Sequence, residues 1–270
     1  MQKNRLKGVP RRSIEIQLVR HATLIIELDD RTLLIDPMLG DVGEFRSFLT
    51  ELTEPPCNTN PTVPLLDDLD LSSILSTVDA VLVTHTHKDH FDDKAADELP
   101  KDLLIFCQPA DEEKLRNTYG FSSVQPVEDD LQYDGIEVFR TDGKHGPDDE
   151  LGPVSGFVLR SQNEPTLYIA GDTIWCQEVE DALKKHQPEI VVVNAGAAQM
   201  LAKPPAITMT KEDVAKVCRY VPSATVIAVH MEAIDHCLLH RKELEDFIES
   251  EGLSERVRIP ADGERMYFAP

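Results

Sequence analysis

The sequence predicts an α/β fold, and two observations support that prediction. Short apolar runs rich in Val, Ile and Leu recur at strand length, first in a cluster and later in alternation with helix-like stretches. The 270 residues are 41% hydrophobic and 28% charged. That composition is typical of a soluble globular chain, and the length is ample for a core that needs no disulfides.

Each predicted element has a local cause. Strands are expected at the apolar runs 13–19, 23–28, 31–36, 80–84, 102–106, 135–140, 156–160, 166–171, 189–194 and 225–230. Helices are expected at 93–99, 110–120, 174–186, 210–221 and 241–252. Asp111, Thr210 and either Asp172 or Thr173 can cap three of the helix starts, and Gly120 and Gly252 can end two helices.

Residues 39–76 depart from this pattern, because they are rich in Gly, Pro and Asn and contain no strand-length run. A loop of that length in a compact domain is usually a lid or a binding loop. No internal repeat and no linker divides the rest of the chain. We therefore expect one domain over residues 1–270 with a loop insertion at about 39–76.

The charge and the cysteines exclude several classes of partner. The 27 Lys and Arg against 49 Asp and Glu give a net charge of −22, which disfavours nucleic acid and anionic membranes, although a small anion in a basic cleft still fits. The five cysteines form no CxxC pair, and no apolar run is long enough to span a membrane. We expect a cytoplasmic protein without integral membrane association.

The chemistry-bearing stretch is VDAVLVTHTHKDHFD at 78–92. Alternate residues of an extended chain share a face, so His85 and His87 can grip one cation while Asp89 and His90 point to a second. Burying these four side chains together is costly unless a cation holds them. Imidazole and carboxylate ligands suit zinc, with manganese or iron as alternatives, and the absence of a cysteine ligand argues against a purely structural zinc site.

Three more candidate ligands follow apolar strands. His145 comes after the run at 135–140, Asp172 follows TLYIAG, and His230 ends TVIAVH. Rigid strands can aim such side chains at one sheet edge while the loops leave an open face.

These motifs, in this order, resemble the metallo-β-lactamase superfamily of metallohydrolases. The stretches RHATLIIE, LLIDPM, NAGAAQ and HMEAIDHC resemble the branch that contains ascorbate-6-phosphate lactonase and the N-acyl phosphatidylethanolamine phospholipase D-like proteins. The resemblance implies a four-layer αββα sandwich of two mixed β-sheets, with two divalent metal ions in a cleft at one sheet edge. It assigns His85, His87 and His145 to one metal, Asp89, His90 and His230 to the other, and Asp172 to a bridge between them.

The function expected from this ligand set is metal-dependent hydrolysis. Two cations can lower the pKa of a bridging water toward ~7, and the resulting hydroxide would attack an ester, lactone or phosphodiester of a small molecule. Asp89 or Asp172 could then shuttle the proton to the leaving group. The alternatives are a non-catalytic metal-binding or regulatory module of the same fold, and an iron oxidoreductase.

The substrate contacts are less well marked in the sequence. His21, Asn194 and His236 are the candidates, and Asp36 is expected to be a buried carboxylate that orients ligands. A second set of basic residues could hold a phosphate on the substrate, namely Arg20, Lys88, Lys144 and Lys203. The more common alternative is that such side chains are simply solvated. His186 and His240 are expected to be solvated. Exposed sheet edges could support self-association into a homo-oligomer.

Overall fold

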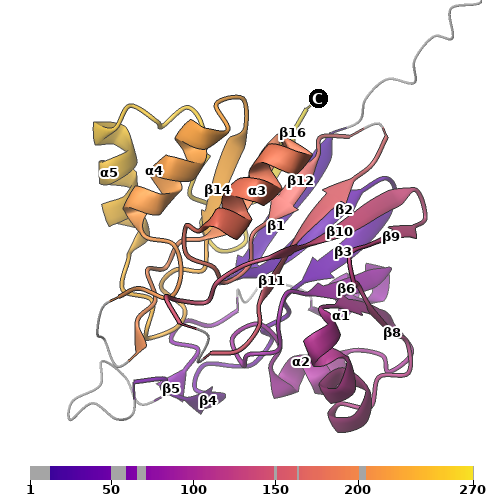
Figure 1. Cartoon of the computed structure of the whole chain (residues 1–270). Coiled ribbons are helices and arrows are strands. Elements are labelled where there is room, and N and C mark those ends of the chain that lie inside the picture. Colours follow the sequence, from indigo (N-terminus) through magenta and orange to yellow (C-terminus); the bar gives the residue numbers. More distant parts are fainter. Residues whose placement is uncertain are drawn as a thin grey trace, which may run out of the picture.

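The computed structural model describes residues 13–49, 59–65, 71–148, 151–162, 164–200 and 205–269. Within these ranges the chain forms two large mixed β-sheets that pack face to face, with helices on both outer surfaces (Figure 1). The expected αββα sandwich is thereby confirmed.

The first sheet has the strand order β16-β1-β2-β3-β6-β7-β8. Its strands are β1 (Ile14–Arg20), β2 (Thr23–Leu28), β3 (Arg31–Ile35), β6 (Ala80–Val83), β7 (Leu104–Cys107), β8 (Val124–Pro126) and β16 (Arg265–Phe268). The pairs from β16 to β3 are antiparallel, whereas β3, β6, β7 and β8 run parallel.

The second sheet has the order β15-β14-β13-β12-β11-β10-β9. Its strands are β9 (Asp130–Tyr133), β10 (Ile136–Asp142), β11 (Ser155–Arg160), β12 (Leu167–Ile169), β13 (Ile190–Asn194), β14 (Thr225–Val229) and β15 (Val257–Arg258). Strands β12 to β15 are parallel, and β9 to β12 are antiparallel.

The helices cover the two outer faces (Figure 1). They are α1 (Leu71–Thr77), α2 (Asp93–Glu98), α3 (Gln177–His186), α4 (Lys211–Tyr220) and α5 (Arg241–Ser250). Helices α3, α4 and α5 bury their apolar faces on the second sheet, for example through Leu183, Val217 and Leu244. Ala95 of α2 packs on the first sheet.

The central core lies between the sheets and explains the apolar runs of the sequence. Leu18, Ile26 and Leu82 of the first sheet share one buried cluster with Phe157 and Val192 of the second. Strands of the parallel regions are covered on both faces, so they read as continuous apolar runs rather than alternating ones.

The insertion contains structure that the sequence did not indicate. Strands β4 (Phe45–Arg46) and β5 (Thr59–Asn60) form a small two-stranded sheet, and α1 lies at the end of the insertion. No helix within the described ranges combines the length and apolar character needed to cross a bilayer.

The helical stretch predicted at 110–120 is present as one irregular segment over 109–118, which passes from a 3-10 turn at Pro109–Asp111 through α-helical residues 112–113 to a π-helical turn at Lys114–Thr118. Two of the predicted helix caps were wrong. Asp111 is no cap, because its carboxylate accepts hydrogen bonds from Thr86 Oγ1 and Gln108 Nε2. Cys176, rather than Asp172 or Thr173, precedes α3, and it makes no side-chain capping bond.

The predicted cap of α4 is confirmed. The Thr210 hydroxyl accepts a hydrogen bond from the Asp213 backbone N–H, and the Asp213 carboxylate accepts one from the Thr210 N–H, which together form a capping box. This exchange satisfies two N–H groups that the first turn of a helix leaves without partners.

Replacing Thr210 with Ala is therefore expected to lower the free energy of unfolding by about 1 kcal/mol. The measurement is urea denaturation followed by circular dichroism. Ser250→Ala removes an exposed hydroxyl at the end of α5 that bonds only to the Phe247 carbonyl, and it should change stability by less than about 0.5 kcal/mol. Equal effects of the two variants would contradict the capping role.

Candidate metal centre

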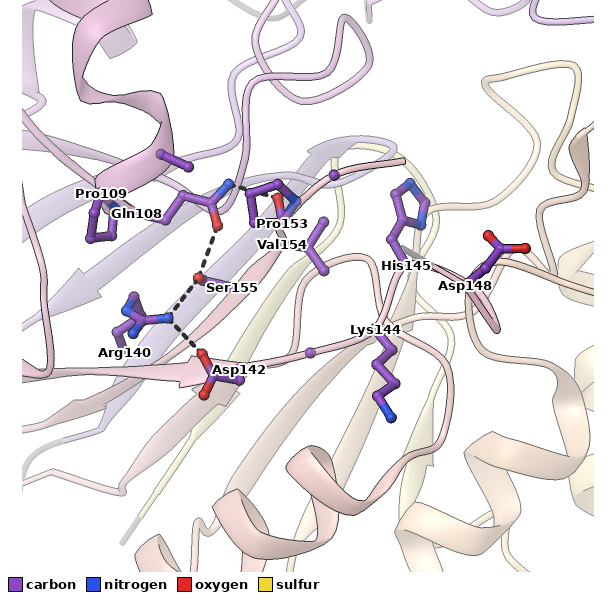
Figure 2. Close-up of a pocket in the computed structure, with 13 residues that line it drawn as sticks. Gln108, Pro109, Arg140, Asp142, Lys144, His145, Asp148, Pro153, Val154 and Ser155 are labelled. Carbon is purple, nitrogen blue, oxygen red and sulfur yellow. Dashed lines mark hydrogen bonds and ion pairs between the residues drawn. The ribbon is translucent and has the colours of Figure 1, made fainter. Parts of the chain in front are cut away.

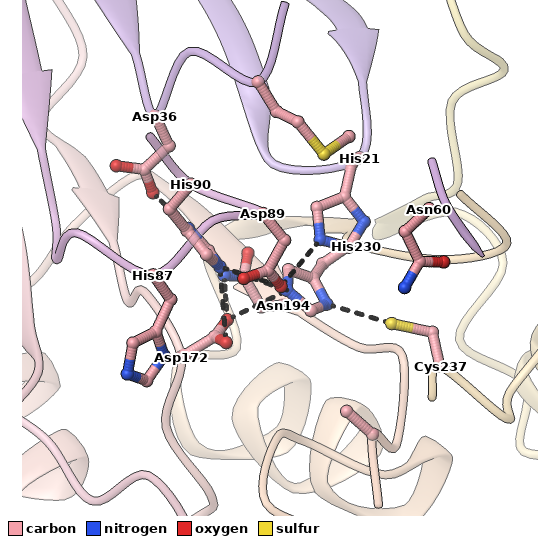
Figure 3. A network of polar contacts seen from close by, with 12 residues as sticks. His21, Asp36, Asn60, His87, Asp89, His90, Asp172, Asn194, His230 and Cys237 are labelled. Carbon is pink, nitrogen blue, oxygen red and sulfur yellow. Dashed lines mark hydrogen bonds and ion pairs between the residues drawn. The ribbon is translucent and has the colours of Figure 1, made fainter. Parts of the chain in front are cut away.

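The predicted ligands meet where strands of both sheets end. His85 follows β6, His145 follows β10, Asp172 follows β12 and His230 follows β14. Figure 3 shows Asp89, His90, Asp172 and His230, which come from three separate segments, pointing toward one another. The rigid strands thus position donors that are far apart in the sequence.

The backbone turns sharply at these strand ends. His21, Asp36 and His230 have φ values of 60°, 42° and 65°, which lie in the left-handed region. Asp and His enter this region more readily than most residues, and such conformations cluster at functional sites. Gly171, with φ 69°, precedes Asp172, and a Cβ there would lie 2.7 Å from the Ser155 carbonyl oxygen. Only glycine fits at that position.

The first donor group consists of His85, His87 and His145, which the family resemblance assigned to one metal. One ligand atom from each lies within 4.8 Å of the other two. His85 Nε2 and His87 Nδ1 are 3.0 Å apart. The i, i+2 spacing of the motif therefore brings both rings to one face, as expected from an extended chain.

The second donor group contains Asp89, His90 and His230, together with His21. The Nε2 atoms of His90 and His230 are 3.2 Å apart, and Asp89 Oδ2 lies 3.4 Å from His230 Nε2. His21 Nε2 also lies 3.4 Å from Asp89 Oδ2.

Asp172 lies between the two donor groups. Its Oδ2 is 3.3 Å from His90 Nε2 and 3.5 Å from His145 Nε2, and its Oδ1 is 3.3 Å from His230 Nε2. Asn194 Nδ2 donates a hydrogen bond of 2.6 Å to Asp172 Oδ1 and fixes the carboxylate. This placement is what a bridging ligand requires.

A set of outer contacts orients the imidazole rings. His90 Nδ1 donates to Asp36 Oδ2 at 2.8 Å, and His145 Nδ1 donates to the Ile207 carbonyl at 3.0 Å. The Thr84 hydroxyl donates to Asp36, so its oxygen accepts from His85 Nδ1 at 3.1 Å.

His230 Nδ1 faces the sulfur of Cys237 at 3.4 Å. Nδ1 therefore faces a partner outside the cluster in four histidines, His85, His90, His145 and His230. This leaves the lone pair of each Nε2 directed into the cluster. The expected role of Asp36 matches this geometry, whereas sequence reasoning missed Thr84 and Cys237.

Burial and charge shift the pKa values of the cluster strongly. Burial alone would raise the pKa of Asp89 and Asp172, yet nearby imidazoles, His90 for the first and His230 for the second, hold both well below the usual range. Burial would lower the pKa of His90, but Asp172, Asp89 and Asp36 raise it to about 10. Burial lowers the pKa of His85. The carboxylates therefore stay ionised and attract positive charge.

This donor set fits divalent cations. Inward Nε2 lone pairs only about 3 Å apart repel one another unless a proton or a cation lies between them. The two buried carboxylates likewise need a positive partner. Neutral imidazole and carboxylate are ligands that zinc, manganese and iron accept.

The predicted substrate contacts have three different placements. His236 lines a cavity beside the donors. His21 is completely buried in the second donor group, and Asn194 is buried against Asp172, so neither is among the residues that line that cavity.

One candidate phosphate contact, Arg20, is engaged elsewhere, and the expectation that His186 is solvated was wrong. Arg20 is buried and donates to the backbone carbonyls of Val63, Met38 and Gly40, so it holds loops together rather than a phosphate. His186 is buried against Phe139 instead of solvated. Lys203 lies outside the described residues.

Among the described residues, two of the cavities adjoin the donors. The larger, of about 550 Å³, reaches the donors through His145 (Figure 2). Its Arg140 is hydrogen-bonded to Asp142 and Ser155, and Ser155 bonds Gln108, so its polar groups satisfy one another. A smaller cavity of about 320 Å³ is lined by His87, Asp89 and His145, and it has more direct access to both donor groups.

Known proteins resemble this chain over most of its length. The family described as Beta-lactamase superfamily domain matches residues 31–231. The UPF0173 protein YddR of Bacillus subtilis (strain 168) is 40% identical over 94% of this chain and 100% of its own. Other UPF0173 relatives carry the name metal-dependent hydrolase.

Two solved structures share both sequence and fold. The isothiocyanate hydrolase from Delia radicum gut bacteria is 37% identical, with a TM-score of 0.86 over 95% of this chain and 100% of that one. A possible metal-dependent hydrolase from Veillonella parvula DSM 2008 is 34% identical, with a TM-score of 0.87 over 93% and 98%. The chain therefore belongs to the metallo-β-lactamase superfamily, and with its UPF0173 relatives it is a metal-dependent hydrolase.

Proposed function

We propose that this chain hydrolyses a small molecule at an electrophilic centre. The first candidate for that centre is the carbonyl carbon of an ester or a lactone, and the second is the phosphorus of a phosphodiester. The observation that carries the proposal is the pair of inward Nε2 atoms of His90 and His230, 3.2 Å apart and flanked by Asp89 and Asp172. Such a pair is suited to a cation that takes part in chemistry, because the neighbouring cavity gives a substrate access to it.

Divalent cations held by the two donor groups would supply a Lewis acid and would lower the pKa of a water molecule. We favour zinc, because nitrogen and oxygen donors with an open side are typical of catalytic zinc sites. We also favour a cytoplasmic location, where the four described cysteines, all free, would stay reduced.

The two carboxylates divide the remaining work. Asp89 lines the cavity, so it can accept a proton from the attacking water and pass it to the leaving group. Asp172 is held by Asn194 away from the cavity wall, which favours a role in positioning the cations.

A second candidate reaction is isothiocyanate hydrolysis. A relative with that name is 37% identical over 95% of this chain. Addition of water to the carbon of R–N=C=S, followed by cleavage of the C–N bond, gives the amine R–NH₂ and carbonyl sulfide. This carbon is an electrophile like a carbonyl carbon, so the same site could serve it.

A substrate panel tests the proposal. The protein as purified is assayed with zinc on aryl and alkyl esters, lactones, phosphodiesters and isothiocyanates, with release of acid, alcohol or amine followed by chromatography. Turnover of at least one class is expected, and the preferred class identifies the reaction. If the metal-loaded protein turns over none of these substrates, the result would favour the alternative that the chain is a non-catalytic metal-binding or regulatory module.

Metal removal should change stability as well as activity. We expect about two equivalents of metal per chain by inductively coupled plasma mass spectrometry. Metal at about 100 times its Kd stabilises by about 2.7 kcal/mol, so a chelator should lower Tm by about 5–10 °C, and zinc should restore it. A metal-free protein with an unchanged Tm after zinc addition would contradict the metal centre.

Replacing His87 or Asp172 with Ala should remove a ligand. Mutating a residue that only hydrogen-bonds a metal ligand typically lowers metal affinity or activity about 10–100-fold. Loss of a ligand itself should cost more, so each variant should lose at least about 100-fold in kcat/KM and bind less metal. His240→Ala is the matched control, since His240 is exposed and contacts Glu232 outside the cluster. Undiminished turnover in both ligand variants would refute the assignment.

A further inference from the structure

The smaller cavity beside the donors has an apolar end built from separate loops. Phe48 comes from the insertion, Leu151 from the loop between β10 and β11, Ile207 from the loop before α4, and His236 from the loop after β14. His87, Asp89 and His145 line the same cavity, and the ring centroid of His236 lies 6.4 Å from that of His230. A molecule in this cavity would therefore meet both the donors and apolar side chains.

The apolar end rests on a small core of its own. Met38, Ala198, Ile234 and Cys237 are buried members of that cluster, as is Ile207. Phe48 and Leu151 pack against it, and so does Phe45 from the same insertion. The apolar end therefore rests on packed side chains rather than being a chance gap between loops.

Asp235 fixes the insertion next to this core. Its carboxylate accepts hydrogen bonds from the Ser47 hydroxyl, from the Phe48 N–H at 3.3 Å and from Asn60 Nδ2 at 2.8 Å. Its own N–H donates to Asn60 Oδ1 at 3.0 Å. These bonds hold Phe48 against the loop that carries His236.

The rings of Phe48 and His236 are stacked, with centroids 4.8 Å apart and an angle of 28°. His236 is only 5% exposed, and both of its ring nitrogens lack a hydrogen-bond partner among the described residues. A buried imidazole without a partner is unfavourable, so a ligand that supplied one would be stabilised there.

The lysines near this cavity already have partners. Lys88 pairs with Asp93, and Lys114 donates to the Thr86 carbonyl at 2.7 Å. The ion pair occupies Lys88, whereas the carbonyl leaves the charge of Lys114 in place. The part of the lining formed by Phe48, Leu151 and Ile207 favours an uncharged group.

We propose that this end of the cavity is a subsite for a neutral aryl or arylalkyl group of the substrate, and that His236 hydrogen-bonds the heteroatom that joins this group to the reacting carbon. The subsite rests on the proposed function, because it places the reacting carbon beside His87 and Asp89. Phe48 then selects for an apolar group, and His236 positions the bond to be broken.

Binding can be tested without turnover. The metal-loaded protein, labelled with ¹³C at its methionine methyl groups, is titrated with 2-phenylethanol and separately with ethanol. Met200 lines the cavity, and Met200→Leu assigns its resonance. A saturable shift of this resonance with 2-phenylethanol and none with ethanol is expected. No saturable shift, or the same response to both alcohols, would overturn the subsite.

Matched variants separate the two side chains. Phe48→Leu should weaken 2-phenylethanol binding about 10-fold, and His236→Phe, which keeps an aromatic ring but no nitrogen, should weaken it about 2- to 10-fold. The control for the first is Phe45→Leu, in the same apolar cluster but not among the cavity-lining residues. The control for the second is the exposed His240→Phe. Equal effects of variants and controls would overturn the assignment.

A kinetic series distinguishes this inference from the proposed function. With methyl, butyl and phenylethyl members of the class that the panel identifies, kcat/KM should rise at least about 10-fold toward the phenylethyl member, and Phe48→Leu should flatten the rise. Turnover without such a gradient would overturn the subsite and leave the function. Saturable binding of 2-phenylethanol with no turnover of any class would support the subsite and overturn the function.

Discussion

The structure depends on the burial of charge at one edge of its two sheets. Asp36, Asp89 and Asp172 are each at most 3% exposed, and His21, His85, His90 and His230 are at most 2% exposed. Such a cluster is stable only if each carboxylate has hydrogen-bond donors or a cation beside it. Asp36 accepts from His90 and, through the Thr84 hydroxyl, is linked to His85. One carboxylate therefore orients a ligand in each donor group, and the two groups are joined as a unit.

The central strands could be predicted from the sequence because burial on both faces produces continuous apolar runs. The expected strand at 23–28 has the observed bounds of β2 (Thr23–Leu28). Short strands nearer the sheet edges were missed. Strands β8 and β9 have exposed positions and few apolar residues, so they lack the apolar run by which a buried strand is recognised. They are strands because their backbone pairs with a neighbouring strand, and that pairing cannot be read from the local sequence.

The candidate site was predictable to the extent that its donors follow strands. Motif spacing and strand ends were sufficient to indicate His85, His87 and His145, which the structure brings together. The remaining roles depend on contacts between distant residues. Asn194 bonds Asp172, and His21 lies beside Asp89, 68 positions away in the sequence. No local feature separates these residues from substrate contacts, so the sequence could not assign them.

The loop at 230–237 shows how the metal centre and the substrate cavity are connected. His230 is a member of the second donor group, and Cys237 at the other end of the loop faces its Nδ1. Between them, Asp235 binds the insertion and His236 lines the cavity. A displacement of the insertion would move Asp235, and through this short loop it would also move His236 and His230. The shape of the substrate subsite and the geometry of the donors are consequently set by the same backbone segment, to which Ser47, Phe48 and Asn60 of the insertion are hydrogen-bonded through Asp235.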